Sequence, residues 1–209
     1  MLDASSTALD WSAAWRDLAL PAPPPAVLDT VLRAWAEPHR RYHTLQHLAE
    51  CLALFARERA LADRPGEVGL ALWFHDAVYD TSRHDNEAAS AAWAASVMRA
   101  AGAGDEVVMR VQSLILATRH DGVPATADAR LLVDIDLAIL GAAPERFDEY
   151  ERQIRAEYAF VPAARFRAKR GEILRGFLDR SALYATTALA SRLEAPARAN
   201  LARAIAGLA

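Results

Sequence analysis

The sequence has few of the features that mark secreted, membrane-spanning or nucleic-acid-binding proteins. Its 209 residues include a single cysteine, Cys51, so no disulfide can form within the chain, and we expect a buried structural thiol. No apolar run approaches the roughly 18 residues that a membrane-spanning helix needs. The formal net charge of -3 gives no basic surface for nucleic acid or a membrane. The N-terminal residues lack the basic and then apolar segments of a secretory signal, so a cytoplasmic protein is the simplest expectation.

Alternation of apolar and polar residues with a period of two is also missing, which argues against β-strands. Hydrophobic residues make up 53% of the chain, and many of them are alanine, the best helix former. The apolar residues recur three and four positions apart in most segments, which is typical of amphipathic helices. These patterns predict an all-α bundle of roughly eight to ten helices, arranged as a single domain.

Prolines and glycines divide this helical pattern into segments. The proline cluster at 21–25 ends a first helix, Asp105 is expected to cap a later one, and Pro196 is expected to break the alanine-rich C-terminal helix. We predict that Trp11, Trp15 and Trp35 are core aromatics.

A few strongly polar side chains interrupt the apolar helices. His43 and His47 are four residues apart and are expected to share a helix face. Residues 70–74 are uninterruptedly apolar and lead directly into His75 and Asp76. Burying such groups is costly unless they are paired or bind a metal, and imidazole with carboxylate suits a divalent first-row ion. The residues alone leave two interpretations open, a metal site or a set of core histidines and helix-capping aspartates.

The local sequences around these residues resemble the HD superfamily, and within it a bacterial group of metal-dependent HD phosphohydrolases. The resemblance rests on four segments in order, RYHTLQH at 41–47, WFHDAVYD at 73–80, DNE at 85–87 and DIDLAILG at 134–141. It covers about residues 40–184 and implies a helical bundle, which agrees with the periodicity. Residues 9–36 and 185–209 are then helical extensions of a single domain that spans residues 1–209.

The resemblance also implies a metal-binding set. It assigns the metal ligands to His47, His75, Asp76 and Asp136, with His43 and Asp134 as the competing choices for the first and last positions. The ion would be divalent, and manganese, iron, cobalt, nickel and magnesium all tolerate such ligands.

Further residues receive roles from the same resemblance. His120 would bind a second metal or the substrate phosphate, and Asp80 and Glu87 would transfer protons. Arg41 and Arg170 would neutralise phosphate charge, although Arg170 belongs to a run of basic residues (165–170) of the kind that usually forms a solvated helix face.

The function that follows is metal-dependent hydrolysis of a phosphoester in a small phosphorylated molecule, with a nucleotide as the first candidate substrate. Two alternatives stay open, an HD-type diiron oxygenase and a nucleotide-binding module without catalysis. Neither nucleic acid nor a membrane is expected as a partner. Assembly into a homo-oligomer, for example through the C-terminal helix, is left open by the sequence.

Overall fold

Ten α-helices and two short 3-10 helices form the part of the chain, residues 4–208, that the computed structural model describes. No strand occurs within these residues, so the all-α prediction of eight to ten helices is confirmed. None of the helices described is both long and apolar enough to cross a membrane. The elements are α1 (Ala4–Asp17), α2 (Pro25–Trp35), α3 (Leu45–Glu58), η1 (Arg59–Leu61), α4 (Pro65–Phe74), α5 (Asn86–Ala100), α6 (Asp105–Ala117), α7 (Ala127–Asp136), η2 (Leu137–Gly141), α8 (Pro144–Glu157), α9 (Ala163–Leu178) and α10 (Thr187–Leu208).

The chain divides into two compact units, Met1–Ile135 and Asp136–Ala209. The boundary falls at the last residue of α7, where the α-helix tightens into the 3-10 helix η2. The single domain expected from the sequence remains a prediction.

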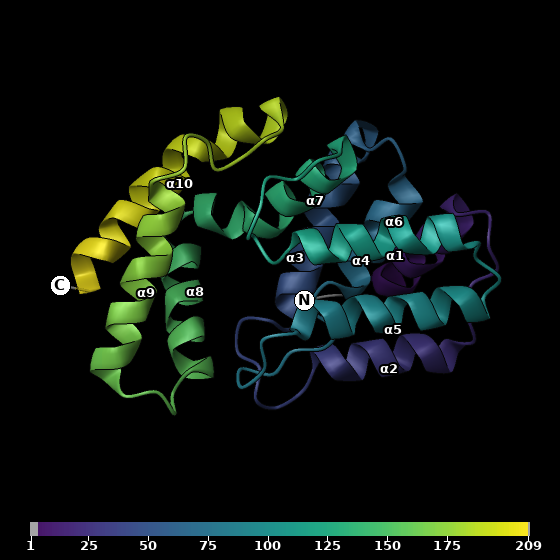
Figure 1. Ribbon diagram of the computed structural model, residues 1–209, viewed down its shortest axis with the longest axis horizontal. Coiled ribbons are helices and arrows are strands. Elements are labelled where there is room, and N and C mark those ends of the chain that lie inside the picture. The colour runs from purple at the N-terminus through teal and green to yellow at the C-terminus, as the bar shows by residue number, and fades with distance from the viewer. Residues whose placement is uncertain (1–3, 209) are drawn as a thin grey trace. The chain divides into compact units, whose positions relative to one another are not determined.

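The first unit is built around α4, which packs against α1, α3, α5 and α6 (Figure 1). Every residue of α4 after Pro65 is buried, in keeping with its apolar sequence on all sides. Close packing at its first turn requires a glycine, because a Cβ on Gly66 would lie 2.9 Å from the Cβ of Asp17 and the backbone nitrogen of Leu18. A helix enclosed in this way holds the residues at its two ends in fixed positions.

Aromatic side chains join α1 and α2 to this central helix. The Trp11 ring lies 5.3 Å from that of Trp73 and 6.0 Å from that of Phe74. The indole N–H of Trp35 donates to the backbone carbonyl of Trp73. Trp11, Trp15 and Trp35 are all buried, so the prediction of core aromatics is confirmed.

The second unit packs α10 against η2 and α9, and α8 against η2. The expected break at Pro196 is wrong, because α10 continues through that residue to Leu208. Leu189, Ala197 and Leu201 are buried on both sides of the proline, so packing offsets the backbone hydrogen bond that proline cannot donate. Asn200 adds hydrogen bonds from its amide to the backbone carbonyls at the end of η2 and just beyond it.

One helix cap also differs from expectation. Asp105 is the first residue of α6 rather than its cap, and Gly104 occupies the cap position with no side-chain hydrogen bond. The Asp105 carboxylate instead accepts a hydrogen bond from Arg99 at the end of α5. An acidic residue in the first turn still interacts favourably with the helix dipole.

Candidate metal centre

His47 lies in the first turn of α3 and is buried. Thr44 caps this helix, because its hydroxyl accepts a hydrogen bond from the backbone N–H of Gln46. His43 precedes the cap, so the expectation that His43 and His47 share a helix face is wrong. The His43 ring instead stacks on Tyr79, with centroids 4.1 Å apart.

His75 follows the last residue of α4 and has no exposed surface. Its Nδ1 lies 2.8 Å from the carbonyl oxygen of Leu72, one turn earlier. Because a carbonyl can only accept, this contact assigns the ring proton to Nδ1. In the neutral ring the Nε2 atom then carries a lone pair, which is the state needed of a metal ligand.

The Nε2 edges of the two buried histidines face each other. The Nε2 atoms of His47 and His75 are 3.2 Å apart. An Oδ2 atom of Asp76 lies 3.3 Å from His75 Nε2 and 3.9 Å from His47 Nε2. The other ring nitrogen of His47, Nδ1, is 3.0 Å from the hydroxyl of Tyr42. Metal-binding histidines are commonly oriented through their second nitrogen, as both rings are here.

These separations fit a common ion. Metal–ligand bonds of about 2.0 to 2.3 Å place two ligands of one ion about 3 to 3.6 Å apart. The distances from His75 Nε2 to His47 Nε2 and to the Asp76 carboxylate both fall in that range. The carboxyl end of α4 lies beside these atoms and carries the negative end of the helix dipole. The position therefore favours positive charge as well as offering lone pairs.

Two further potential ligands, Cys51 and Asp136, lie close to the two histidines. One ligand atom each from His47, Cys51, His75 and Asp136 lie within 4.8 Å of one another, the only such metal-capable group among the described residues. Asp136 is carried by α7, which ends at that residue. The group contains Asp136 and His47, and neither of their competitors from the sequence, Asp134 and His43; Asp76, although 3.3 Å from His75 Nε2, is not part of it. Asp134 is buried in α7.

The buried Arg40 holds the backbone around His75 and Asp76 in place. The Arg40 guanidinium donates to the carbonyl oxygens of Asp76 (2.6 Å), Ala77 (3.0 Å) and His43 (3.2 Å). It also donates to the Glu37 carboxylate, and it lies over the ring of Trp35. Because one buried guanidinium donates to three backbone carbonyls, it links the segment before α3 to the segment after α4. Arg40 is thus placed to position both His47 and Asp76.

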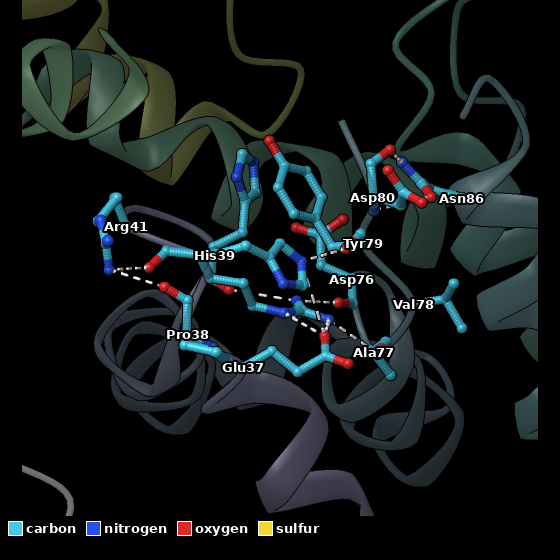
Figure 2. A network of polar contacts seen from close by, with 12 residues as sticks. Glu37, Pro38, His39, Arg41, Asp76, Ala77, Val78, Tyr79, Asp80 and Asn86 are labelled. Atoms are coloured by element: carbon cyan, nitrogen blue, oxygen red, sulfur yellow. Dashed lines mark hydrogen bonds and ion pairs between the residues drawn. The ribbon is translucent and has the colours of Figure 1, made fainter. Parts of the chain in front are cut away.

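The two acidic residues expected to transfer protons, Asp80 and Glu87, follow His75 and Asp76 in the sequence. Asp80 is exposed and accepts hydrogen bonds from the side chain and backbone of Ser82, which lower the pKa of its carboxyl group. Asn86 bonds to the backbone N–H and carbonyl of Asp80 and so ties this loop to α5 (Figure 2). Glu87 is half-buried in the first turn of α5.

His120 lies in the loop after α6, as expected, and is half-buried. Its backbone has a φ of 56°, in the left-handed region that residues other than glycine rarely adopt. Such conformations persist only where the surrounding structure holds them, and they are concentrated at functional sites. The role expected of His120 stays a prediction.

The two arginines expected to bind phosphate differ in their surroundings. Arg41 is exposed, and its guanidinium donates to the backbone carbonyls of Pro38 and Arg40. Arg170 is buried and ion-paired with Glu151, and it lies 5.0 Å from the ring centroid of Tyr150. Unlike the exposed residues Arg165, Arg167 and Lys169 of its run, Arg170 therefore belongs to the interior of the second unit.

Sequence reasoning missed three residues of this centre: Arg40, Tyr42 and Cys51. A signal existed for Cys51, which is four residues after His47 on a helix, and for Tyr42, which stands inside the 41–47 segment. Nothing in the composition distinguished Arg40 from Arg41, because only the fold decides which of two adjacent arginines is buried.

No family model, curated protein or solved structure matches this chain. The geometry of the centre therefore carries the functional argument.

Proposed function

We propose that the protein is a metal-dependent phosphohydrolase that acts on a small phosphorylated molecule, with a nucleotide as the first candidate. The observation that carries this proposal is the meeting of the His47 and His75 Nε2 atoms beside the Asp76 carboxylate, at the end of a helix that is buried throughout after Pro65. The resemblance of the sequence to HD phosphohydrolases supports the same assignment.

His47, His75, Asp76 and Asp136 would hold a divalent ion. When bound, that ion supplies Lewis-acid chemistry, which polarises a phosphoryl oxygen and lowers the pKa of water. The second-nitrogen contacts to Leu72 and Tyr42 keep the two rings oriented with Nε2 towards the ion. Four protein ligands leave room for water and phosphate at an ion that takes six.

The remaining residues act on the substrate and on protons. Asp80 is the first candidate for proton transfer, and the hydrogen bonds from Ser82 that lower its pKa keep it a carboxylate but make it a weaker base. Glu87 is the second candidate for that role. His120 and Arg41 are the proposed partners of the phosphate and its developing charge, which electrostatic contacts stabilise in phosphoryl transfer. Arg170 is not included, because it is buried and already paired with Glu151 inside the second unit.

The test combines metal content with phosphate release. Protein purified without chelator is analysed for metals and assayed on a nucleotide panel with manganese, cobalt, nickel or magnesium. About one ion per chain and phosphate release from a subset of the panel are expected. His75→Ala and Asp76→Ala should each reduce metal affinity by at least about tenfold to a hundredfold, the cost already seen when only outer-shell partners are removed.

Matched controls are available on the same unit. His84 and Asp29 are exposed, so His84→Ala and Asp29→Ala should leave metal content and phosphate release unchanged. If His75→Ala retained both metal and activity, the proposed centre would be wrong. Two irons per chain with no phosphate release would instead favour the diiron oxygenase, and tight nucleotide binding without product would favour the binding module.

A further inference from the structure

The cysteine of α3 lies next to the histidine pair. Cys51 is 2% exposed and comes one helical turn after His47, so the two side chains lie on the same face of α3. Its Sγ is 3.7 Å from Nδ1 and 3.8 Å from Nε2 of His47. The thiol is therefore not simply part of the general core, since it borders the same nitrogen that faces His75.

The spacing of these donors is close to that of ligands on one ion. With metal–nitrogen bonds of about 2.0 to 2.1 Å and a metal–sulfur bond of about 2.3 Å, a tetrahedral ion separates nitrogen and sulfur by about 3.5 Å. The Cys51 Sγ to His47 Nε2 distance is 3.8 Å, and the four donors of the group lie within 4.8 Å of one another. A small adjustment of the thiol side chain would bring it to a ligand position.

Charge balance points the same way. Two neutral imidazoles, one thiolate and one carboxylate together offset the two positive charges of a divalent ion. His47, His75, Cys51 and Asp136 provide this combination. Because sulfur is a soft donor, such a set prefers zinc or cobalt to magnesium or manganese.

We propose that Cys51 is a direct ligand of the metal centre and that its thiolate selects a thiophilic first-row ion. This inference rests on the proposed function in that both use His47, His75 and Asp136, and it gives Cys51 the ligand position that the proposed function gives to Asp76. The thiol releases its proton to solvent as the sulfur–metal bond forms, and no oxidant or reductant is required. An ion that expands beyond four ligands keeps a position for water and phosphate.

Cobalt titration tests whether Cys51 binds the metal, without any measurement of catalysis. Metal-free full-length protein is titrated with Co²⁺ under reducing conditions and followed by absorption spectroscopy. A sulfur-to-cobalt charge-transfer band in the near ultraviolet is expected, which saturates at one ion per chain. The wild-type spectrum alone decides whether sulfur is bound, so the result does not depend on any variant folding.

Two variants sharpen the test. Cys51→Ser and Cys51→Ala should abolish the charge-transfer band and weaken Zn²⁺ binding by at least about tenfold, while Mn²⁺ affinity changes little. Circular dichroism of the metal-free variants checks that the helices are retained. Met98→Leu, a volume-conserving change at a buried site of α5, serves as a control for core substitution and should leave the spectrum unchanged.

The outcomes separate this inference from the proposed function. Cobalt bound at one ion per chain with no sulfur band, and with Cys51→Ala matching wild type in Zn²⁺ affinity, would overturn the cysteine ligand and leave the His/Asp centre standing. Absence of any cobalt binding would overturn both. A sulfur band without phosphate release from any substrate would support the ligand and count against the phosphohydrolase.

Discussion

The two ends of α4 both hold buried polar groups, but they satisfy them in different ways. At the N-terminal end each buried charge has a protein partner. The Asp128 carboxylate accepts the backbone N–H groups of Asp63 and Arg64, and the Glu67 carboxylate is bound by both nitrogens of the Arg110 fork. At the C-terminal end, His75 Nε2 lies 3.2 Å from His47 Nε2 and 3.3 Å from the Asp76 carboxylate, so potential metal ligands gather there.

Cavities lie near both ends of α4. One of about 550 Å³ lies at the N-terminal end, lined by residues of α4, α6 and the loop before α7. One of about 760 Å³ lies beside residues 77–81, which follow the C-terminal end. The buried charges at the N-terminal end are paired within the protein, whereas the C-terminal end gathers potential metal-binding side chains beside its cavity. The kind of side chain gathered there, rather than the presence of open space, distinguishes the two ends.

The largest loss of stability is expected from replacing Arg40, which holds the backbone at the C-terminal end of α4. Arg40→Met removes a fully buried guanidinium and the hydrogen bonds that it donates to three backbone carbonyls. Since each hydrogen bond from a charged group contributes about 1.5 to 3 kcal/mol, we expect a loss of about 3 kcal/mol or more in unfolding free energy. We also expect weaker metal binding, because the backbone of Asp76 and of the segment before His47 would no longer be held. Urea unfolding and cobalt titration measure the two effects.

The neighbouring arginine is the control for that experiment. Arg41→Met removes an exposed side chain and should cost less than about 1 kcal/mol. If the two variants were equally stable and bound cobalt equally well, Arg40 would have no positioning role.

Much of the fold could be predicted from periodicity, because helices bury apolar faces and begin or end at prolines and glycines. The segment 70–74 already indicated a helix apolar on all sides, and α4 is indeed buried throughout after Pro65. Pro196 misled the prediction because local propensity cannot anticipate how far packing of α10 offsets a missing hydrogen bond.

Less of the candidate site could be predicted from the sequence. His75 and Asp76 stand out because polar residues end an apolar run, but the pairing of His75 with His47 depends on how α3 packs against α4. Arg40 carries no local signal of its role, since that role depends on contacts between segments far apart in the chain, whereas the spacing of Cys51 four residues after His47 could have been noticed. The pattern of residues in a single sequence does not reveal long-range contacts of this kind.

An intermediate loss of stability is expected at the N-terminal end of α4, where Glu67 pairs with Arg110. Arg110→Met leaves the Glu67 carboxylate buried, with Arg64 still 3.9 Å away. Because Arg110 is itself 39% exposed, screening reduces the value of the pair, and we expect a loss of about 1 to 3 kcal/mol in unfolding free energy. Cobalt binding should not change, in contrast to Arg40→Met.

A double variant sharpens this prediction. Glu67→Leu with Arg110→Met replaces both charges with apolar groups and should recover most of the lost stability, because a buried pair is often no better than a hydrophobic one. Equal losses in the double variant and in Arg110→Met would show that the burial of an unpaired Glu67 is not the cause.

The smallest effect concerns Asp128. Asp128→Asn keeps one acceptor oxygen for the two backbone N–H groups before α4, so we expect a loss of about 1 kcal/mol near neutral pH. In the wild type, burial raises the pKa of the Asp128 carboxyl, and this outweighs the hydrogen bonds from Asp63 and Arg64 that lower it.

The sign of the pH dependence follows from that raised pKa. Between the ordinary aspartate pKa of 3.8 and the raised value, the folded state binds more protons than the unfolded state. The contribution of Asp128 to unfolding free energy therefore falls as pH rises through this window and is constant above it. Urea unfolding of both proteins from about pH 4 to about pH 7 should show the wild type losing stability relative to Asp128→Asn, since asparagine does not titrate. A difference that stayed constant over this range would mean that the carboxyl titrates alike in the folded and unfolded chains, and that its two backbone hydrogen bonds fully offset the cost of burying it.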